Sequence, residues 1–220
     1  MCLLLSFLLL TAGLTAEDRL QAFGVKWSVP VASDWKIESQ QGTPVLTMLT
    51  AHPPEKDKPR KPTQFALAQT GAFEKVTVEA EVKRLAKSLI IVYAYRDDLH
   101  FNYAHLSGDS AKEQIVHNGI FHVYGGDRVR ISRADAPGSL PSADEWYKVR
   151  LDFDAASGTV DVAVNGQPNT SLHGIDLSLG AGQVGLGSFF ETAMFRNVRI
   201  TGQVSGNVAG NVAGHQAAEK

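Results

Sequence analysis

Hydrophobic and polar residues alternate with a period of two along most of the chain. The pattern is clearest in residues 75–84 (KVTVEAEVKR), 145–154 (EWYKVRLDFD) and 159–166 (TVDVAVNG). The apolar positions of the second segment are Tyr147, Val149, Leu151 and Phe153. Such alternation is typical of antiparallel strands with one buried side and one solvent-facing side. We therefore expect these four side chains to be buried and the charged residues between them to be largely exposed.

Further strands are expected along the rest of the chain. Residues 88–98 (SLIIVYAYRDD) are apolar with little interruption, which favours a central strand. The remaining strands are predicted at 25–31, 35–40, 43–50, 64–69, 127–133, 182–189 and 196–201. Residues 155–158 (AASG) would close a hairpin, and no amphipathic helix is longer than a turn or two. About a dozen short strands without helices predict an all-β fold, a two-sheet antiparallel jelly-roll sandwich.

Differences in composition divide the chain into segments. Residues 1–16 (MCLLLSFLLLTAGLTA) are an apolar run that ends in small residues, which indicates a secretory signal peptide. Residues 17–202 carry the strands and are expected to form one β-sandwich domain. Residues 203–220 contain a GNVA repeat and almost no large apolar side chain, which predicts a flexible tail. Residues 52–62 (HPPEKDKPRKP) contain four prolines and are expected to be an exposed loop.

Charge and cysteine content limit the partners and the compartment. A net charge of −2 over 220 residues provides no basic field for nucleic acid. The one cysteine, Cys2, lies in the predicted signal peptide, so the mature chain would contain no disulfide. Such a chain suits a bacterial periplasm or exterior, and it would be periplasmic or secreted. No stable membrane insertion is expected once the signal peptide is removed.

Histidines are concentrated in one part of the chain. Four of the seven fall between His100 and Gly126. We predict that residues 99–106 and 116–124 are neighbouring antiparallel strands. A single register then aligns three cross-strand pairs, namely His105 with His117, His100 with His122, and Phe101 with Phe121. The two histidine pairs would lie on opposite faces of the sheet.

The face with His105 and His117 combines aromatic rings with hydrogen-bonding groups. Such a mixture suits a sugar, whose C–H face packs on rings while its hydroxyls find donors and acceptors. The candidate ligand-binding residues are Tyr103, His105, His117, Asn118, Arg128 and Arg130. We expect His100 and His122 to be ordinary, partly buried histidines.

No motif in the sequence requires a metal or a cofactor. There is no HExxH sequence, and only two histidines share each predicted face, so we expect no zinc site. Four oxygen-bearing side chains would suit a structural Ca²⁺ by type, although their spacing matches no calcium motif. They are Asp97, Asp98, Asn102 and Asp109. The first two are expected to cap a turn instead.

Three segments within residues 75–202 carry a family resemblance. They are IVYAYRDDLHFNYAHLS, the Trp-led hairpin EWYKVRLDFDAASGTVDVAVNG, and the closing strands GQVGLGSFFETAMFRNVRITG. This part of the chain resembles the concanavalin A-like lectin/glucanase superfamily, particularly its laminin-G-like and keto-disaccharide-hydrolase-like bacterial branches. The resemblance implies the concanavalin A-like sandwich, a fold that hosts lectins, hydrolases and plain adhesion modules. The glucanases of the superfamily carry a Glu-x-Asp-x-Glu strand, which is missing here, and this puts their two-carboxylate mechanism in doubt.

Three functions follow from these observations. The first is an exported carbohydrate-binding module, accessory to glycan degradation. The second is a glycoside hydrolase, with His105 or His117 as acid/base, Glu191 as partner carboxylate and Arg128 as charge stabiliser. The third is a laminin-G-type adhesion module without a small ligand. A deep cleft of His, Glu and Arg would indicate the enzyme, and a shallow aromatic groove would indicate the binding module.

Overall fold

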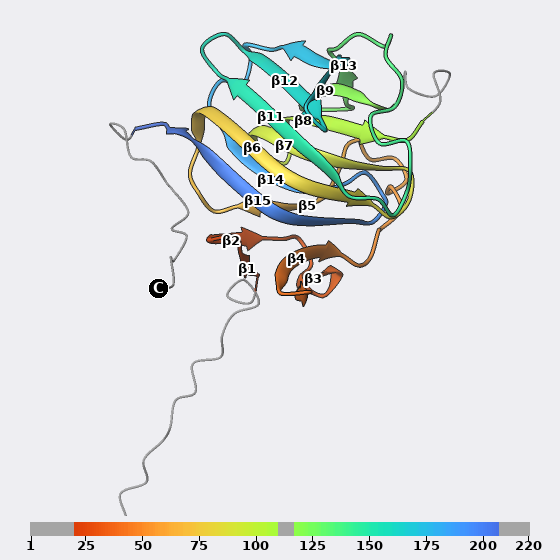
Figure 1. Cartoon of the computed structure of the whole chain (residues 1–220). Helices are drawn as coiled ribbons and strands as arrows, with labels where there is room; N and C mark the ends of the chain where they lie inside the picture. Colours follow the sequence, from red (N-terminus) through yellow and green to blue (C-terminus); the bar gives the residue numbers. More distant parts are fainter. Residues whose placement is uncertain (1–19, 110–116, 207–220) are drawn as a thin grey trace, which may run out of the picture.

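The computed structural model describes residues 20–109 and 117–206, which form two packed antiparallel sheets (Figure 1). This confirms the predicted all-β, two-sheet jelly-roll sandwich. Two layers follow from the alternating pattern, because each strand offers one apolar side that is buried against the other sheet. The predicted signal peptide, residues 1–16, and most of the predicted tail lie outside the described residues.

One sheet has eight strands. Their order is β1 (Gln21–Ala22), β2 (Val25–Ser28), β5 (Gln64–Ala68), β14 (Gln183–Ser188), β7 (Ser88–Asp97), β8 (His100–Ser107), β9 (Gly119–Tyr124) and β10 (Val129–Arg130). Strand β7 is the predicted central strand, and its first seven residues are all buried. Burial on both faces explains why its sequence does not alternate.

The other sheet has seven strands. Their order is β13 (Gln167–Ile175), β12 (Thr159–Val164), β11 (Tyr147–Asp154), β6 (Phe73–Arg84), β15 (Ala193–Val204), β4 (Thr43–Met48) and β3 (Trp35–Gln40). In the view of Figure 1, β12, β11, β6 and β15 lie in front of the other sheet. The described residues contain one short 3-10 helix, Ala32–Asp34. No helix among them is long and apolar enough to cross a bilayer.

The core between the sheets is built from the predicted apolar positions. Tyr147, Val149, Leu151 and Phe153 are all buried, as predicted, whereas Lys148 and Arg150 are exposed. The N-terminal strands belong to the same core, because Trp27, Trp35, Leu46 and Met48 pack in it. The segment before residue 75, to which the family resemblance did not extend, is therefore part of the sandwich.

Strands β8 and β9 are antiparallel neighbours, as predicted, but the predicted register is wrong by two residues. His105 lies opposite Gly119, and Tyr103 lies opposite Phe121. The physical reason is that β9 begins only at Gly119. The preceding Asn118 has a left-handed backbone with φ of 47°, which breaks the ladder before His117. A shift of two residues keeps every side chain on its predicted face.

Two further expectations differ from the structure at the sheet edges. The edge strand β13 was not predicted, because its sequence QPNTSLHGI contains a proline and lacks apolar alternation. The strand predicted at 127–133 is reduced to the two residues of β10. The hairpin turn predicted at 155–158 is confirmed between β11 and β12.

Candidate functional site

A second group of buried side chains lies on the outer face of the eight-stranded sheet, away from the core between the sheets. Along β8, Phe101, Tyr103 and His105 point outward, while Ala104 and Leu106 point into the core. We call five outward-facing rings the aromatic row: Phe65, Phe101, Tyr103, Phe121 and Phe189. Phe65 contacts Phe101, Phe101 contacts Tyr103, and Tyr103 contacts both Phe121 and Phe189, with ring centroids 5.4–6.5 Å apart.

Four basic side chains lie over the aromatic row. The Lys61 ammonium is 5.9 Å from the centroid of Phe101, and the Arg60 guanidinium is 5.5 Å from that of Phe189. The Arg128 guanidinium is 4.2 Å from the Phe189 centroid and 4.6 Å from the Phe121 centroid. Arg130 also lies over Phe121, at 5.6 Å. Such cation–π contacts fix the positions of long, flexible side chains.

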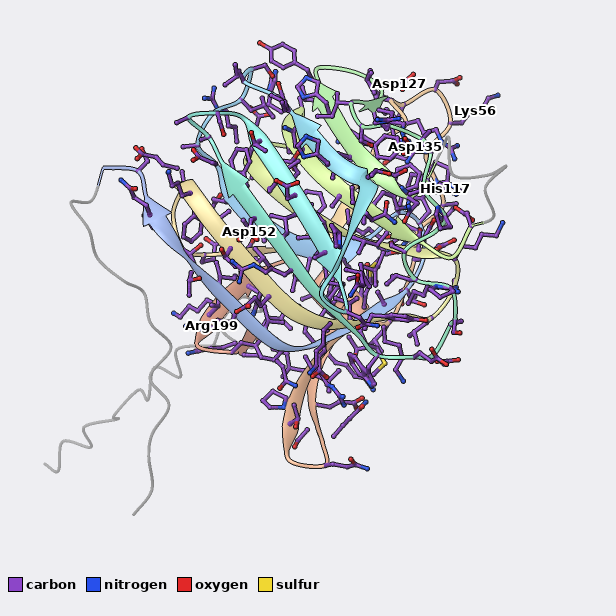
Figure 2. The ribbon with its side chains drawn as sticks, turned by 45° about the horizontal axis from the view of Figure 1, so that its top comes forward. Lys56, His117, Asp127, Asp135, Asp152 and Arg199 are labelled. Carbon is purple, nitrogen blue, oxygen red and sulfur yellow. The ribbon has the colours of Figure 1, made fainter. Side chains whose placement is uncertain are left out.

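Two of these cations come from residues 52–62, which we call the cover loop. The backbone N–H of Arg60 donates to the Asp127 carboxylate at 2.6 Å, and its carbonyl accepts from the Arg128 N–H at 3.1 Å. Figure 2 shows Lys56, Asp127 and His117 on the same side of the molecule, well separated from Asp152 and Arg199. The predicted exposure of the loop is confirmed for most of its residues, but its last part is held against the sheet.

His105 and His117 lie together at one end of the aromatic row. Their ring centroids are 5.1 Å apart, and Nδ1 of His117 contacts the buried carboxylate of Asp109. Nη1 of Arg128 is 3.2 Å from Nδ1 of His105 and donates to the Tyr103 hydroxyl at 3.1 Å. The structure therefore brings Asp109, His117, His105, Arg128 and Tyr103 into one connected group.

His105 is held neutral in this group. An arginine only donates, so Nδ1 of His105 accepts and the ring proton is on Nε2. Nε2 is buried and has no hydrogen-bond partner among the described residues. Burial lowers the pKa of His105 well below its usual value, and the positive charges of Arg128, His117, Arg130 and Arg60 lower it further.

A pocket of about 260 Å³ opens at the other end of the aromatic row. It is lined by Ser28, Val29, Pro30, Lys61, Thr63, Phe65, Leu67, Tyr95 and Asp98. The Tyr95 hydroxyl donates to the Asp98 carboxylate at 2.9 Å, and the Tyr95 and Phe65 rings meet edge to face at 5.6 Å. Burial raises the pKa of Tyr95, and Asp98 raises it further, so its hydroxyl stays protonated. The pocket combines an aromatic wall with hydroxyl, carboxylate and ammonium groups.

Four of the predicted site residues are grouped in this way: Tyr103, His105, His117 and Arg128. Arg130 is close to them, but two of its nitrogens donate to the carbonyls of His117 and Asn118, at 2.9 and 3.0 Å. Asn118 is fully buried and holds residues 137–139 through its side-chain amide. The structure thus gives Asn118 a structural set of contacts.

Glu191 is bound elsewhere. Its carboxylate accepts from the Ser88 hydroxyl at 3.0 Å and from the Ser88 backbone N–H. These bonds tie the loop after β14 to the start of β7. Among the described residues no hydrogen bond or ion pair joins Glu191 to His105 or His117, and the carboxylate that contacts His117 is that of Asp109.

The other two histidines of the stretch lie outside this group. Nδ1 of His122 is 2.8 Å from the Asn102 side-chain oxygen and 3.0 Å from the Asp176 carboxylate, and His100 pairs with Asp97. The four side chains considered for Ca²⁺ have separate partners. Asp97 contacts His100, Asp98 contacts Tyr95, Asn102 contacts His122, and Asp109 contacts His117. Over residues 20–109 and 117–206, no three histidine, cysteine or acidic side chains are placed to hold a metal ion.

Several residues of the site were not predicted from the sequence. Arg60 and Lys61 lie in a loop expected to be exposed, and only its run of basic residues hinted at binding. Phe65 and Phe189 come from β5 and from the loop after β14, both distant from β8 in sequence. Their convergence is a product of strand order, which periodicity does not reveal.

The outer face of the seven-stranded sheet also contains a groove, of about 370 Å³. Its charged walls pair with each other, since Arg150 contacts Glu79 at 3.1 Å and Arg196 contacts Glu81 at 2.7 Å. Glu79 and Glu81 are the nearest approach of the chain to a glucanase-like carboxylate strand. Because both glutamates are paired with arginines, we interpret this face as a solvated surface with salt bridges.

Comparisons with known proteins give the fold. No family model matches the chain, and no curated protein matches its sequence. The carbohydrate-binding module CBM66 from Bacillus subtilis superposes with a TM-score of 0.55 and 14% identity, over 79% of this chain and 94% of that one. A Bacillus subtilis protein of unknown function with a galectin-like fold gives 0.47 and 15%, over 83% and 92%. An alginate lyase of polysaccharide lyase family 7 gives 0.45 and 12%, over 76% and 81%. The superposition on CBM66 shows that the chain has this sandwich fold, the concanavalin A-like sandwich that the three quoted segments predicted.

Proposed function

We propose that this protein is a carbohydrate-binding module whose ligand binds along the outer face of the eight-stranded sheet. The observation that carries the proposal is the pocket at Phe65 and Tyr95, where an aromatic wall stands beside Thr63, Lys61 and Asp98. A sugar needs this combination, because its C–H face packs on rings while its hydroxyls require donors and acceptors. The fold is shared with a protein described as a carbohydrate-binding module.

Export forms the second part of this proposal. The apolar run of residues 1–16 supports it, since such a run with a small-residue end is typical of a secretory signal. An exported bacterial module of this kind would act beside enzymes that degrade glycans, outside the cytoplasm. To test export, the full chain is expressed in bacteria and the amount of protein is measured separately in the periplasmic and cytoplasmic fractions.

A glycan-array screen run beside a degradation screen on the same sugars tests the binding function. Tyr95→Ala should abolish binding of any glycan that the array identifies, because it removes the aromatic wall of the pocket. The matched control is Tyr124→Ala, which removes an aromatic ring that is 60% exposed and stacks on His122 outside the pocket. Equal loss in both variants would contradict the placement of the ligand. A chain that binds no glycan and degrades none would leave the adhesion module as the explanation.

One specific observation favours an enzyme as the second candidate. The buried carboxylate of Asp109 orients His117, whose side chain is 21% exposed, so its other ring nitrogen is available for proton transfer. We call Asp109 and His117 the dyad. Tyr103 lies beside it and provides a hydroxyl, and Arg128 provides a fixed positive charge. The dyad replaces the two-carboxylate arrangement that the sequence lacks.

The enzyme hypothesis predicts that His117→Ala abolishes release of new sugar ends while the melting temperature changes little. His173→Ala is the matched control, because His173 also pairs with a carboxylate, Asp161 at 2.8 Å, but on the seven-stranded sheet. Turnover that persists in His117→Ala at the wild-type rate would exclude the dyad as the catalytic group.

A further inference from the structure

We propose that the ligand of this site is an acidic glycan, whose carboxylate or sulfate groups bind Lys61, Arg60 and Arg128 above the aromatic row. This inference rests on the proposed function, and it adds the charge class of the sugar. The three cations lie side by side along one face of the sheet. Lys61 both lines the pocket and covers Phe101, and Arg60 and Arg128 share the ring of Phe189.

The charge distribution supports this inference. The cover loop carries four lysines and arginines and two carboxylates, a net charge of +2 within a chain whose net charge is −2. Positive charge is therefore concentrated on the face that holds the pocket, against the overall sign of the chain. A local field of one sign above a low-dielectric aromatic surface attracts ligands of the opposite sign.

Three described carboxylates near this face are bound to other partners. Asp127 accepts the backbone N–H of Arg60, Asp109 binds His117, and Asp98 accepts the hydroxyl of Tyr95. None of these three bonds engages the side chain of Arg60 or of Lys61. Among the described residues, those two side chains make cation–π contacts and no ion pair, which leaves their charge for a ligand.

The aromatic row explains why these cations suit binding. A guanidinium that packs over an aromatic ring is already held in place. Its N–H donors can therefore bind a carboxylate or sulfate with a smaller loss of side-chain entropy. Arg60 and Arg128 approach Phe189 together, so an acid group above that ring would meet two guanidinium groups. Burial lowers the pKa of His105, and Arg128, Arg130 and Arg60 lower it further. A neutral histidine in this position does not add a further charge.

The inference also places the sugar along the face. A ring seated in the pocket packs against Tyr95 and Phe65, with its acid group towards Lys61 and away from Asp98. The next acid group along the chain then lies towards Arg60 and Arg128. An extended acidic glycan would thus cover the pocket and the cation-covered part of the row together.

Matched pairs of glycans test the charge class. We would measure binding of polygalacturonate against fully methyl-esterified polygalacturonate, and of dextran sulfate against dextran, by calorimetry with the full chain. The expected result is at least about tenfold tighter binding of one acidic member than of its neutral partner, as one charge-assisted hydrogen bond provides. The carboxylate pair and the sulfate pair distinguish the two acid groups. Binding should weaken in 0.5 M salt, roughly three times the physiological ionic strength at which the screening length is about 8 Å.

Variants test the residues. Lys61→Ala and Arg60→Ala should each weaken binding of the acidic glycan about tenfold, and Arg60→Lys should recover part of the loss because it keeps the charge. Arg199→Ala is the control, since it also removes one positive charge but from the seven-stranded sheet (Figure 2). It should bind as the wild-type chain does.

Each outcome decides between the two proposals. Equal binding of acidic and neutral partners would overturn the acidic class and leave the carbohydrate-binding function standing. No binding of any glycan would overturn both. Equal binding of polyglutamate and of an acidic glycan would show a general polyanion surface, which also overturns the inference. Loss of binding in Arg199→Ala equal to that in Arg60→Ala would show that only net charge matters, not this face.

Discussion

His105 shows how surroundings set the chemistry of one residue. The sequence pattern predicted only the face of the sheet on which its side chain lies. Its protonation follows from complete burial and from Arg128, which donates to Nδ1. Its free Nε2–H is an unsatisfied buried donor, a feature that costs stability and that stable folds rarely keep without a reason.

The neutral state of His105 predicts a pH dependence of stability. Its pKa in the folded chain is well below 6.5, the usual value for the unfolded chain, so the unfolded state binds more protons below pH 6.5. The free energy of unfolding should therefore fall as the pH falls below about 6.5, by at most about 1.4 kcal/mol per pH unit from this group. His105→Gln should flatten that slope in denaturant melts between pH 5 and 6.5. His173→Gln, on an exposed site, should change it less, and equal slopes in all three chains would contradict the prediction.

Leu151 provides the corresponding prediction for the core. It is fully buried on β11, between β6 and β12, and its truncation leaves a cavity that the two sheets close only in part. Leu151→Ala should lower the free energy of unfolding by about 2–5 kcal/mol. Arg150→Ala is the neighbouring control. It removes exposed ion pairs to Glu79 and Asp152, which are worth about 1 kcal/mol or less. A loss below about 1 kcal/mol for Leu151→Ala would mean that the buried face is wrongly assigned.

At the scale of elements, the approach of β14 to β5 depends on glycine. A Cβ on Gly187 would contact the Gln64 carbonyl and would lie 2.6 Å from Cα of Phe65, both backbone atoms that side-chain motion cannot relieve. Gly187→Ala should therefore cost about 1–3 kcal/mol of stability, as overpacking does. Gly126→Ala is the control, because nothing lies within 4 Å of its Cβ position. Thermal melts of both variants measure the difference, and equal melting temperatures would contradict the close approach.

The elements also show where sequence-based prediction succeeds and where it ends. The alternation in β6, β11 and β12 gave their faces, because periodicity reports which side of a strand is buried. It does not report register, so a pairing of His105 with Gly119 was indistinguishable from a pairing with His117. The predicted contact of His105 and His117 is confirmed all the same, since their rings meet at 5.1 Å. The edge strand β13 escaped detection because a sheet edge tolerates polar residues and proline.

The site was predicted in part for a related reason. Tyr103, His105, His117 and Arg128 lie on neighbouring strands or next to them, so local pattern was enough to group them. The cations of the cover loop come from about 40 residues before β8, and the ring of Phe189 comes from about 80 residues after it. Only the order of strands in the sheet brings them together, and no periodicity encodes that order.

At the scale of the molecule, the two sheets share a single core and carry different outer faces. The face of the seven-stranded sheet is a lattice of ion pairs, whereas that of the eight-stranded sheet is aromatic and covered by cations. The fold needs only the core between the sheets. The second cluster of buried aromatic side chains lies outside that core and under the cations, and this makes that face the candidate for function.

The shared core predicts how the whole molecule unfolds. The N-terminal strands contribute Trp27 and Trp35 to the same core as Leu151, and β4 pairs with β15 near the end of the chain. Tryptophan fluorescence and far-UV circular dichroism should therefore report one coincident transition in denaturant. Deletion of residues 20–48 should abolish that transition, because it removes β1 to β4 and exposes the core that they cover. Deletion of residues 207–220 is the control. Among the described residues the last backbone bond runs from the Ser205 N–H to the Ala72 carbonyl and is kept in this variant, so the melting temperature should stay that of the full chain. Two separate transitions in the full chain would show instead that the N-terminal strands fold independently of the sandwich.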